Sequence, residues 1–213
     1  MDISKVNIFR ILHIDNLEYI LRTGKLTTYK HADADTNYKN IGEGELINLR
    51  AEHKITTFGS KNQYSPSNDF LPFYFASRSV MLYRIKTGYN VKQIHQTNIV
   101  YMVYRLKDII DDIDYLFTDG HGYAKFTRWF DNIEYLNEVD WKMIYQVKWN
   151  NTEDDSDRER RKQAEFWVKN ELSLEKIAGI AVFDEAALEK VTVLCNTYQP
   201  NIPIRVVKDY YYQ

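Results

Sequence analysis

The chain has 213 residues, a formal net charge of −2 and 44% hydrophobic residues. These values suit a globular protein with its own core and exclude an intrinsically disordered chain, and the small negative charge argues against a broad basic surface for duplex DNA. No apolar run reaches the length of a membrane span, residues 1–9 lack the apolar core of a signal peptide, and the single Cys195 excludes an internal disulfide. We therefore expect a cytoplasmic protein with no membrane partner.

The N-terminal half is predicted to combine short regular elements with polar loops. Asp15 or Asn16 can cap the first helix because each offers a side-chain acceptor, and Gly24 can end it because glycine tolerates a left-handed backbone. In chain order the elements are a strand at residues 8–13, a helix at 15–24, a polar loop at 29–45, a short helix at 46–53, a polar loop at 58–68, a strand at 70–75 that starts after Pro72, and a buried strand at 98–104.

The C-terminal half contains a clear helix pattern at residues 184–198, where apolar residues fall on one helical face and Asp184 can cap the start. The other elements are a short helix at 108–115, an irregular polar stretch at 118–160 with helices near 125–135 and 139–149, a buried strand at 177–183 and a closing strand at 202–207. Strands and helices do not alternate regularly. The pattern therefore predicts one α+β domain over residues 1–213 with curved sheets.

Common catalytic and cofactor motifs are missing from the sequence. It has no Walker-type phosphate loop, and Gly42-Glu-Gly44 lacks the third glycine and the preceding strand of a dinucleotide fingerprint. The five histidines are scattered without metal-ligand spacing, so no metal is expected. The 17 Tyr and 4 Trp can stack on unpaired bases or build a core, and the basic run at 158–162 can contact phosphates or face solvent.

Four segments are more specific together than any one is alone. They are Phe9-Arg-Ile-Leu-His-Ile-Asp-Asn-Leu17 followed by Ile20-Leu21 and Gly24; Asn37-Tyr38, Ile41-Gly42 and Leu46-Ile-Asn-Leu-Arg50; Leu71-Pro-Phe-Tyr-Phe75 followed by Arg78 and Met81-Leu-Tyr83; and Phe117-Thr-Asp-Gly-His121 followed by Lys162-Gln-Ala-Glu-Phe166. In this order they resemble the DarT family of DNA ADP-ribosyltransferases, and they span nearly the whole chain.

The resemblance implies an ADP-ribosyltransferase-like fold, with two packed, largely antiparallel sheets, peripheral helices and a cleft for NAD⁺. It implies transfer of ADP-ribose from NAD⁺, as co-substrate, to a base in single-stranded DNA. It also implies a toxin of a toxin–antitoxin system whose partner is a macrodomain antitoxin of the DarG type. The opening Arg10-Ile-Leu-His13 resembles the guanine-directed branch of the family more than the thymine-directed branch.

Glu165 is the catalytic carboxylate that the resemblance implies. Cleavage of the nicotinamide–ribose bond gives an oxocarbenium-like sugar, which a neighbouring carboxylate stabilises. In residues 164–168 the apolar side chains alternate, so a strand would direct Glu165 to the face opposite Ala164, Phe166 and Val168. An amphipathic helix with an exposed glutamate fits the same periodicity.

Arg50 is the second catalytic residue that the resemblance implies. A guanidinium stays charged, with a pKa above about 12, so it suits the NAD⁺ phosphates or polarisation of the incoming base better than proton abstraction. Without the resemblance, an arginine on a helix surface is the default interpretation.

The N-terminal segment is expected to bind NAD⁺. Family members commonly carry His-x-Thr there, where this chain has Arg10-Ile11-Leu12. Arg10 can donate to a ribose or phosphate, whereas Leu12 has no hydroxyl. His13 and Asn16 match the family, and Asn16 is the better candidate for a cofactor contact. Further cofactor candidates are Tyr74, for packing on nicotinamide, and Arg78, for a phosphate.

Two loops complete the expected site. Residues 33–52 correspond to a lid over NAD⁺ that excludes water. Residues 118–164 correspond to the loop that holds the target strand. Its candidate DNA-binding residues, which offer phosphate contacts and stacking surfaces, are Asp119, His121, Tyr123, Lys125 and Arg128.

Two other functions are compatible with the sequence. An ADP-ribosyltransferase acting on RNA or protein would use the same active site. A non-enzymatic module that binds single strands would explain the aromatic residues, but it would leave Glu165 and Arg50 without a role.

Overall fold

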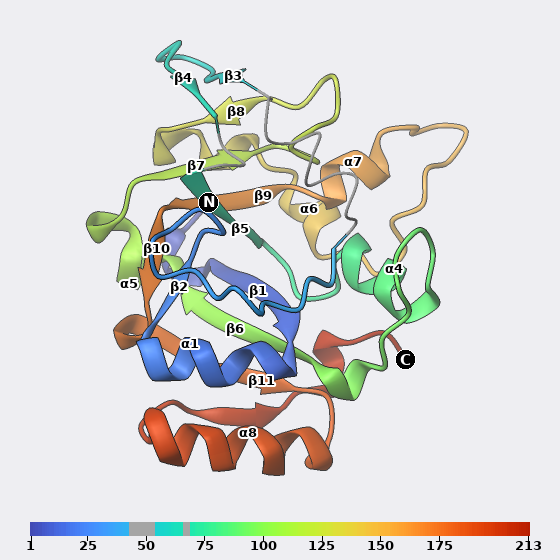
Figure 1. Ribbon diagram of the computed structural model, residues 1–213. Helices are drawn as coiled ribbons and strands as arrows, with labels where there is room; N and C mark the ends of the chain where they lie inside the picture. The colour runs from blue at the N-terminus through green and yellow to red at the C-terminus, as the bar shows by residue number, and fades with distance from the viewer. Residues whose placement is uncertain (43–53, 66–68) are drawn as a thin grey trace.

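The computed structural model describes residues 1–42, 54–65 and 69–213. In this part of the chain the strands form one eight-stranded sheet in the order β12-β11-β6-β1-β5-β9-β7-β8, and two small sheets, β10-β2 and β3-β4 (Figure 1). The strands are β1 (Asn7–His13), β2 (Lys25–Thr27), β3 (Ile55–Thr56), β4 (Gln63–Tyr64), β5 (Phe70–Tyr74), β6 (Ile99–Arg105), β7 (Tyr115–Thr118), β8 (Trp129–Phe130), β9 (Glu165–Lys169), β10 (Glu171–Ser173), β11 (Ile177–Val182) and β12 (Ile204–Val206). All these pairs are antiparallel except β11 with β12.

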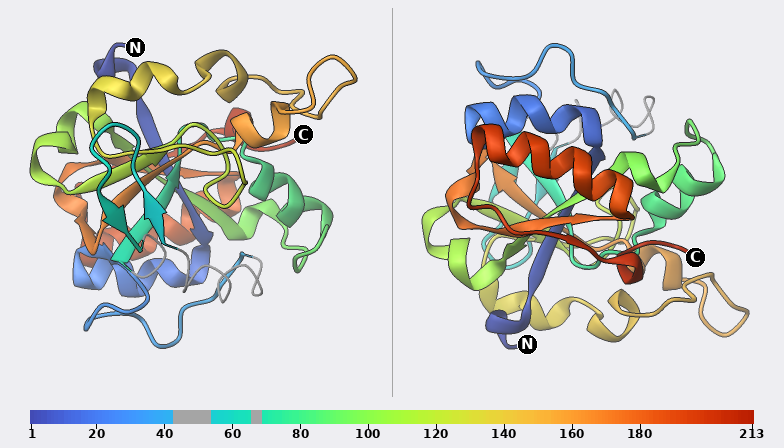
Figure 2. Two further views of the ribbon diagram at one scale, coloured as in Figure 1. Left: turned by 90° about the horizontal axis from the view of Figure 1, so that it is seen from above. Right: turned by 90° about the horizontal axis from the view of Figure 1, so that it is seen from below.

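Helices pack around the sheet. The α-helices are α1 (Leu17–Thr23), α4 (Val80–Thr87), α5 (Leu106–Ile109), α6 (Trp141–Ile144), α7 (Arg158–Lys162) and α8 (Glu185–Tyr198). Short 3-10 helices lie at Ile3–Lys5, Ile14–Asn16, Gln96–Asn98, Ile110–Asp112, Ile133–Glu138, Leu174–Lys176 and Lys208–Tyr210. Helices α1 and α8 lie side by side, as the right-hand view of Figure 2 shows, and α8 packs on β11 and β12. None of the helices in the described ranges has the length and apolar character that crossing a bilayer requires.

The eight-stranded sheet consists of two halves that meet at one point. Strand β1 pairs with β6 along its whole length, and β5 pairs with β9 along its whole length. Between β1 and β5, however, the register contains a single pair, Phe9 opposite Tyr74. The β12-β11-β6-β1 half and the β5-β9-β7-β8 half therefore diverge beyond this pair.

Pro72 explains why the two halves separate. Proline has no backbone N–H, so it cannot donate to a neighbouring strand. Its carbonyl, which faces β1, accepts a hydrogen bond from Nη1 of Arg10 at 2.7 Å. A side chain thus replaces a rung of the backbone ladder, and β1 and β5 stand apart at this position.

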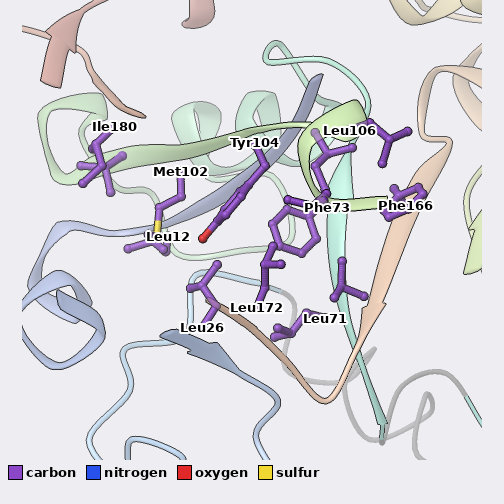
Figure 3. Close-up of a cluster of buried hydrophobic side chains, with 14 of the residues drawn as sticks. Leu12, Leu26, Leu71, Phe73, Met102, Tyr104, Leu106, Phe166, Leu172 and Ile180 are labelled. Carbon is purple, nitrogen blue, oxygen red and sulfur yellow. The ribbon is translucent and has the colours of Figure 1, made fainter. Parts of the chain in front are cut away.

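The main core fills the space between the two halves. It is a continuous cluster of buried apolar side chains drawn from both. Figure 3 shows Tyr104 from the first half next to Phe73 from the second half, with Leu12 and Phe166 in the same cluster. The halves thus behave as two packed layers joined along one edge.

Several sequence predictions are confirmed. The α+β class and the strands near residues 8–13, 98–104, 177–183 and 202–207 are present. Helix α8 begins after Asp184, whose side chain accepts from the N–H of Ala187 at 2.9 Å. Gly24 ends α1 with φ of 73°, a left-handed conformation that glycine adopts without strain.

Other element predictions were wrong. Strand β5 begins at Phe70, before Pro72, because the missing N–H of Pro72 faces the side where β1 has separated. A helix near residues 125–135 is absent: Trp129 and Phe130 pair with β7, and the residues after them form a 3-10 helix. The predicted helix near 139–149 contracts to α6, the predicted loop at 58–68 contains β4, and α7 lies in a stretch predicted as irregular. The helix predicted at 46–53 lies outside the described residues.

Removing the Arg10 guanidinium should weaken the junction between the halves. We expect Arg10→Met to lower the free energy of unfolding by about 1 kcal/mol, because the Pro72 carbonyl loses a charged donor in a half-buried position. Urea unfolding of the variant measures this, with Arg205→Met, an exposed arginine on β12, as the control. Equal stability of the two variants would contradict the bridging role.

Candidate active site

A pocket of about 430 Å³ opens where β1 and β5 separate. This volume falls in the range of small-molecule and cofactor sites, roughly 300–1,000 Å³. Residues of β1, β2, β5 and β9 form its walls, and α1, α4 and the loop of residues 28–42 complete it. The lining residues are Arg10, Ile11, Tyr19, Ile20, Lys25, Leu26, Thr27, Thr28, Tyr29, Ala34, Asp35, Tyr38, Asn40, Ile41, Gly42, Phe70, Leu71, Pro72, Tyr74, Met81, Glu165 and Trp167.

Glu165 begins β9 and lines this pocket. Successive side chains of a strand alternate, so Phe166 enters the core while Glu165 and Trp167 face the pocket. The predicted strand is therefore confirmed, and an amphipathic helix is excluded. Glu165 is only 3% exposed, and its register partner Tyr74 lines the same pocket. A buried carboxylate in a pocket wall can stabilise positive charge that develops on a bound molecule.

Hydrogen bonds join the start of β9 to the loop between β7 and β8. The N–H of Gly122 donates to Oε2 of Glu165 over 3.4 Å, and the N–H of Glu165 donates to Oγ1 of Thr118 at 2.9 Å. Thr118 is fully buried and its hydroxyl also donates to the carbonyl of Gly120 at 2.7 Å. The backbone at Glu165 is thus held against this loop.

Asp119 connects the two ends of the same loop, residues 119–128, through its carboxylate. Its Oδ1 accepts from the backbone N–H of Arg128 at 2.9 Å and from Nη1 of Arg160 at 3.0 Å, and its Oδ2 accepts from Nε of Arg128 at 2.8 Å. Asp119 is 6% exposed, although the sequence suggested a DNA contact. The two arginines compensate the desolvation of the buried carboxylate, which leaves it as a structural clamp in this conformation.

Arg128, also predicted to bind DNA, has its charge directed toward protein groups. In addition to Asp119 it pairs with Glu138 at 2.9 Å. Its guanidinium lies over the rings of Phe58 and Phe130, with 5.5 Å from Cζ to each centroid. These contacts fix the end of the 119–128 loop beside the β3–β4 hairpin.

The other DNA-binding candidates lie on the loop between these fixed ends. His121 and Tyr123 pack edge to face with ring centroids 6.2 Å apart. Lys125 places its Nζ 5.8 Å from the centroid of Phe126, which is 76% exposed. The structure therefore brings three of the five candidates together, along with an exposed aromatic ring that the sequence prediction did not single out.

The basic run at residues 158–162 binds the segment before it. Arg161 pairs with Asp140 and Asp155, and Arg158 donates to two backbone carbonyls at residues 148 and 150. Lys162 is buried and donates to the carbonyls of residues 144 and 146, and burial lowers the pKa of its amine to about 8. The sequence left two interpretations open, contact with phosphates and a solvated surface. In this conformation the side chains do neither, because they bind protein groups.

The predicted cofactor residues of the N-terminal segment divide between the pocket and its surroundings. Arg10 lines the pocket. Leu12 is fully buried in the main core, because it faces the other half of the sheet, and it does not reach the pocket. His13 also lies outside the lining: its Nδ1 accepts from the N–H of Asp15 at 3.2 Å, and burial lowers the pKa of the imidazole.

Asn16 holds the loop over the pocket. Its amide donates to the carbonyl of Lys39 at 2.9 Å and accepts from the N–H of the same residue at 2.8 Å. Asn16 is buried and occupies the N-cap position of α1 without capping it. Next to it, Asp15 pairs with Lys39 and with Lys190 of α8, each at 2.6 Å. The end of the 28–42 loop is therefore tied to α1 and α8.

The beginning of this loop is tied to β2 and β10. Lys25 bridges Asp33 at 2.9 Å and Glu171 at 2.8 Å. His31 Nε2 lies 3.1 Å from the same Glu171 carboxylate. Side chains from neighbouring elements therefore hold residues 33–42 of the predicted lid, and residues 43–52 of it lie outside the described residues.

Of the remaining candidates, Tyr74 lines the pocket and Arg78 does not. Arg78 lies between β5 and α4, and its carbonyl accepts from the hydroxyl of Tyr212 at 3.0 Å. Arg50 lies outside the described residues. The sequence prediction missed Trp167, which the two-residue period of β9 could have placed beside Glu165, and it missed the pocket tyrosines Tyr19, Tyr29 and Tyr38.

Comparisons with known proteins agree with this geometry. A family profile described as "ssDNA thymidine ADP-ribosyltransferase, DarT" matches residues 9–212. A protein of Thermus sp. strain 2.9 named DNA ADP-ribosyl transferase is 31% identical over 210 residues, covering 96% of this chain and 95% of its own length.

Solved structures are also similar. Thermus sp. 2.9 DarT in complex with ADP-ribosylated ssDNA matches with a TM-score of 0.85 and 29% identity, covering 97% of this chain and 96% of that one. The same protein in complex with NAD⁺ matches with a TM-score of 0.79 and 28% identity, covering 100% and 99%. The predicted ADP-ribosyltransferase-like fold is thereby confirmed.

The ion pairs that hold the end of the 28–42 loop should depend on pH. Hydrogen bonds from Lys190 and then Lys39 lower the pKa of Asp15 from 3.8 to about 2. A carboxylate with a lowered pKa contributes stability above its unfolded value, and this contribution is lost as the pH falls from about 4 to 2.

We expect Asp15→Asn to lower the free energy of unfolding at pH 7 by about 1 kcal/mol, after allowance for solvent screening of this partly exposed group. Between pH 4 and pH 2 the free energy of unfolding of the variant should fall less than that of the wild type. Urea unfolding across this range measures the effect. Asp111→Asn, at an exposed position, is the control. Parallel pH curves for wild type and Asp15→Asn would contradict the assignment.

Proposed function

The chain belongs to the DarT family, and on this premise we propose that it transfers ADP-ribose from NAD⁺ to a base of single-stranded DNA. The observation that carries the proposal is the buried Glu165 carboxylate in the wall of the pocket, at the point where the two halves of the sheet separate. The NAD⁺ and ADP-ribosylated ssDNA complexes of the similar Thermus DarT support the choice of donor and acceptor.

Glu165 acts on the ribose next to nicotinamide. Its carboxylate binds the 2′-hydroxyl and stabilises the positive charge that develops on the sugar as the glycosidic bond breaks. Tyr74, opposite Glu165 in the register, packs on the nicotinamide. The 28–42 loop restricts water, which would otherwise compete with the DNA base for the activated sugar.

Arginines supply the positive groups. Arg10 lines the pocket and therefore lies near the bound NAD⁺. Its guanidinium N–H groups that do not bond Pro72 can donate to a ribose or a phosphate. Arg50 contacts the NAD⁺ phosphates or polarises the incoming base. Arg78 binds a phosphate at the edge of the site.

The 119–128 loop receives the DNA strand. His121, Tyr123 and Lys125 lie on a loop whose ends are fixed by Asp119. A base inside a duplex is inaccessible, whereas an unpaired base can stack on such aromatic groups and reach the ribose. RNA and protein acceptors are outcomes that the experiments below distinguish.

Guanine is the target base that we propose, because the Arg10-Ile-Leu-His13 opening resembles the guanine-directed branch. Thymine is the second candidate, because the matching family profile names thymidine. The family also supports a role as a cytoplasmic toxin that is counteracted by a macrodomain antitoxin of the DarG type.

Glu165→Gln should abolish transfer without unfolding the protein. We expect a loss of about 100- to 1,000-fold in rate, because the amide keeps the shape of the side chain and removes the charge that stabilises the sugar. Mass spectrometry of an oligonucleotide incubated with NAD⁺ measures adduct formation, and the melting temperature verifies folding. Glu185→Gln, an exposed change on α8, should retain full activity. Transfer by Glu165→Gln at the wild-type rate would overturn the assignment.

The target base can be read from single-stranded oligonucleotides that each lack one base. We expect an added ADP-ribose only on oligonucleotides that contain guanine. Dependence on thymine would replace guanine and retain the enzyme class. Adducts on RNA or protein, with none on any DNA, would contradict the proposed acceptor.

A further inference from the structure

Trp129 is connected to Glu165 by hydrogen bonds to the backbone of one glycine, Gly122. It is the first residue of β8 and is 4% exposed. Its indole Nε1–H donates to the carbonyl of Gly122 at 3.1 Å. The N–H of the same glycine donates to Oε2 of Glu165 over 3.4 Å. Two backbone groups of one residue therefore connect a buried indole to the carboxylate.

Gly122 is enclosed on both sides. A Cβ atom on this residue would lie 3.0 Å from Cζ2 of Trp129 and 3.1 Å from Oε2 of Glu165. A side chain at this position would therefore require the indole and the carboxylate to shift by a few tenths of an ångström.

The three strands of this region fix the ends of the connection. Trp129 is the register partner of Thr118 on β7, and Thr118 Oγ1 accepts from the N–H of Glu165 on β9. The backbone positions of Trp129 and Glu165 are therefore both set by Thr118. The loop before Gly122 is held by the Thr118 hydroxyl on the Gly120 carbonyl and by the His121 N–H on the Arg160 carbonyl, and the indole hydrogen bond holds Gly122 itself.

The length of the Gly122–Glu165 contact makes it sensitive to loop position. At 3.4 Å it lies beyond the usual 2.7–3.2 Å of an N–H···O bond, so a small displacement of the loop breaks it. Such contacts commonly tighten when substrate binds. A group that holds the loop close therefore affects how the carboxylate is oriented during the reaction.

From these contacts we propose that Trp129 is a positioning residue for Glu165, acting through Gly122. This inference rests on the proposed function, because it assigns a consequence to the orientation of a catalytic carboxylate. Trp129 does not line the pocket. Its loss should lower kcat and leave the KM for NAD⁺ unchanged.

Trp129→Phe tests the role of the indole N–H, because phenylalanine keeps an aromatic ring and has no donor. We expect kcat to fall about three- to tenfold, the effect of losing one neutral hydrogen bond from the transition state. Gly122→Ala tests the other side of the connection and should lower kcat by at least as much. Both variants should keep a KM for NAD⁺ within about twofold of wild type, which a general loosening of the fold would not preserve.

Trp141→Phe is the matched control. Its indole also donates to a backbone carbonyl, that of Leu136 at 2.9 Å, and its ring packs against Phe75 as the ring of Trp129 packs against Trp167. It has no connection to Gly122 among the described contacts. We expect it to retain wild-type kcat. Equal kcat for Trp129→Phe and Trp141→Phe, together with a fully active Gly122→Ala, would overturn the proposal.

A crystal structure of Trp129→Phe gives a readout that is independent of activity. We expect the Gly122 carbonyl to move and the Glu165 carboxylate to leave the Gly122 N–H. An unchanged Glu165 carboxylate would overturn the positioning role. A wild-type chain that modifies no DNA would instead contradict the proposed function, and the crystal structure would still decide the orientation of Glu165.

Discussion

The separation of β1 from β5 is the constraint on which the site depends. A sheet of this size would normally continue its ladder of backbone hydrogen bonds through its centre. Here Pro72 lacks the N–H that one rung requires, and Arg10 satisfies the remaining carbonyl. The pocket opens at this break, and β9 on the far side of β5 brings Glu165 to its wall.

Charged side chains near the site are used mainly to build loops. Asp119 gathers Arg128 and Arg160 inside the 119–128 loop, and Arg161 holds the segment that contains Asp140 and Asp155. The ion pairs of the buried Asp119 contribute little net stability but define one geometry, since removing one partner leaves a buried charge, whereas the Arg161 pairs are partly exposed. The nucleophile in this reaction is a base of a flexible DNA strand. We interpret the ion pairs as preorganising the surface that binds this strand.

The loop over the pocket is also held by a buried polar side chain, in this case an amide. Asn16 uses both ends of its amide on the backbone of Lys39, so the side chain replaces a neighbouring strand. A residue expected to touch the cofactor thereby acts on the loop that encloses it.

The sequence by itself determined the elements whose pattern is local. Strands β1, β6 and β11 and the capped helix α8 follow from side-chain period and capping, which act over a few residues, whereas the periodicity around Glu165 fitted a strand or a helix. The resemblance indicated the fold and the position of Glu165. The tertiary structure decided the rest: Pro72 inside a strand, Leu12 in the core, Asp119 between two arginines, and Gly122 between Trp129 and Glu165. Each of these depends on partners distant in sequence, and the same residue type is exposed or buried, free or bonded, according to which distant partner folding brings to it.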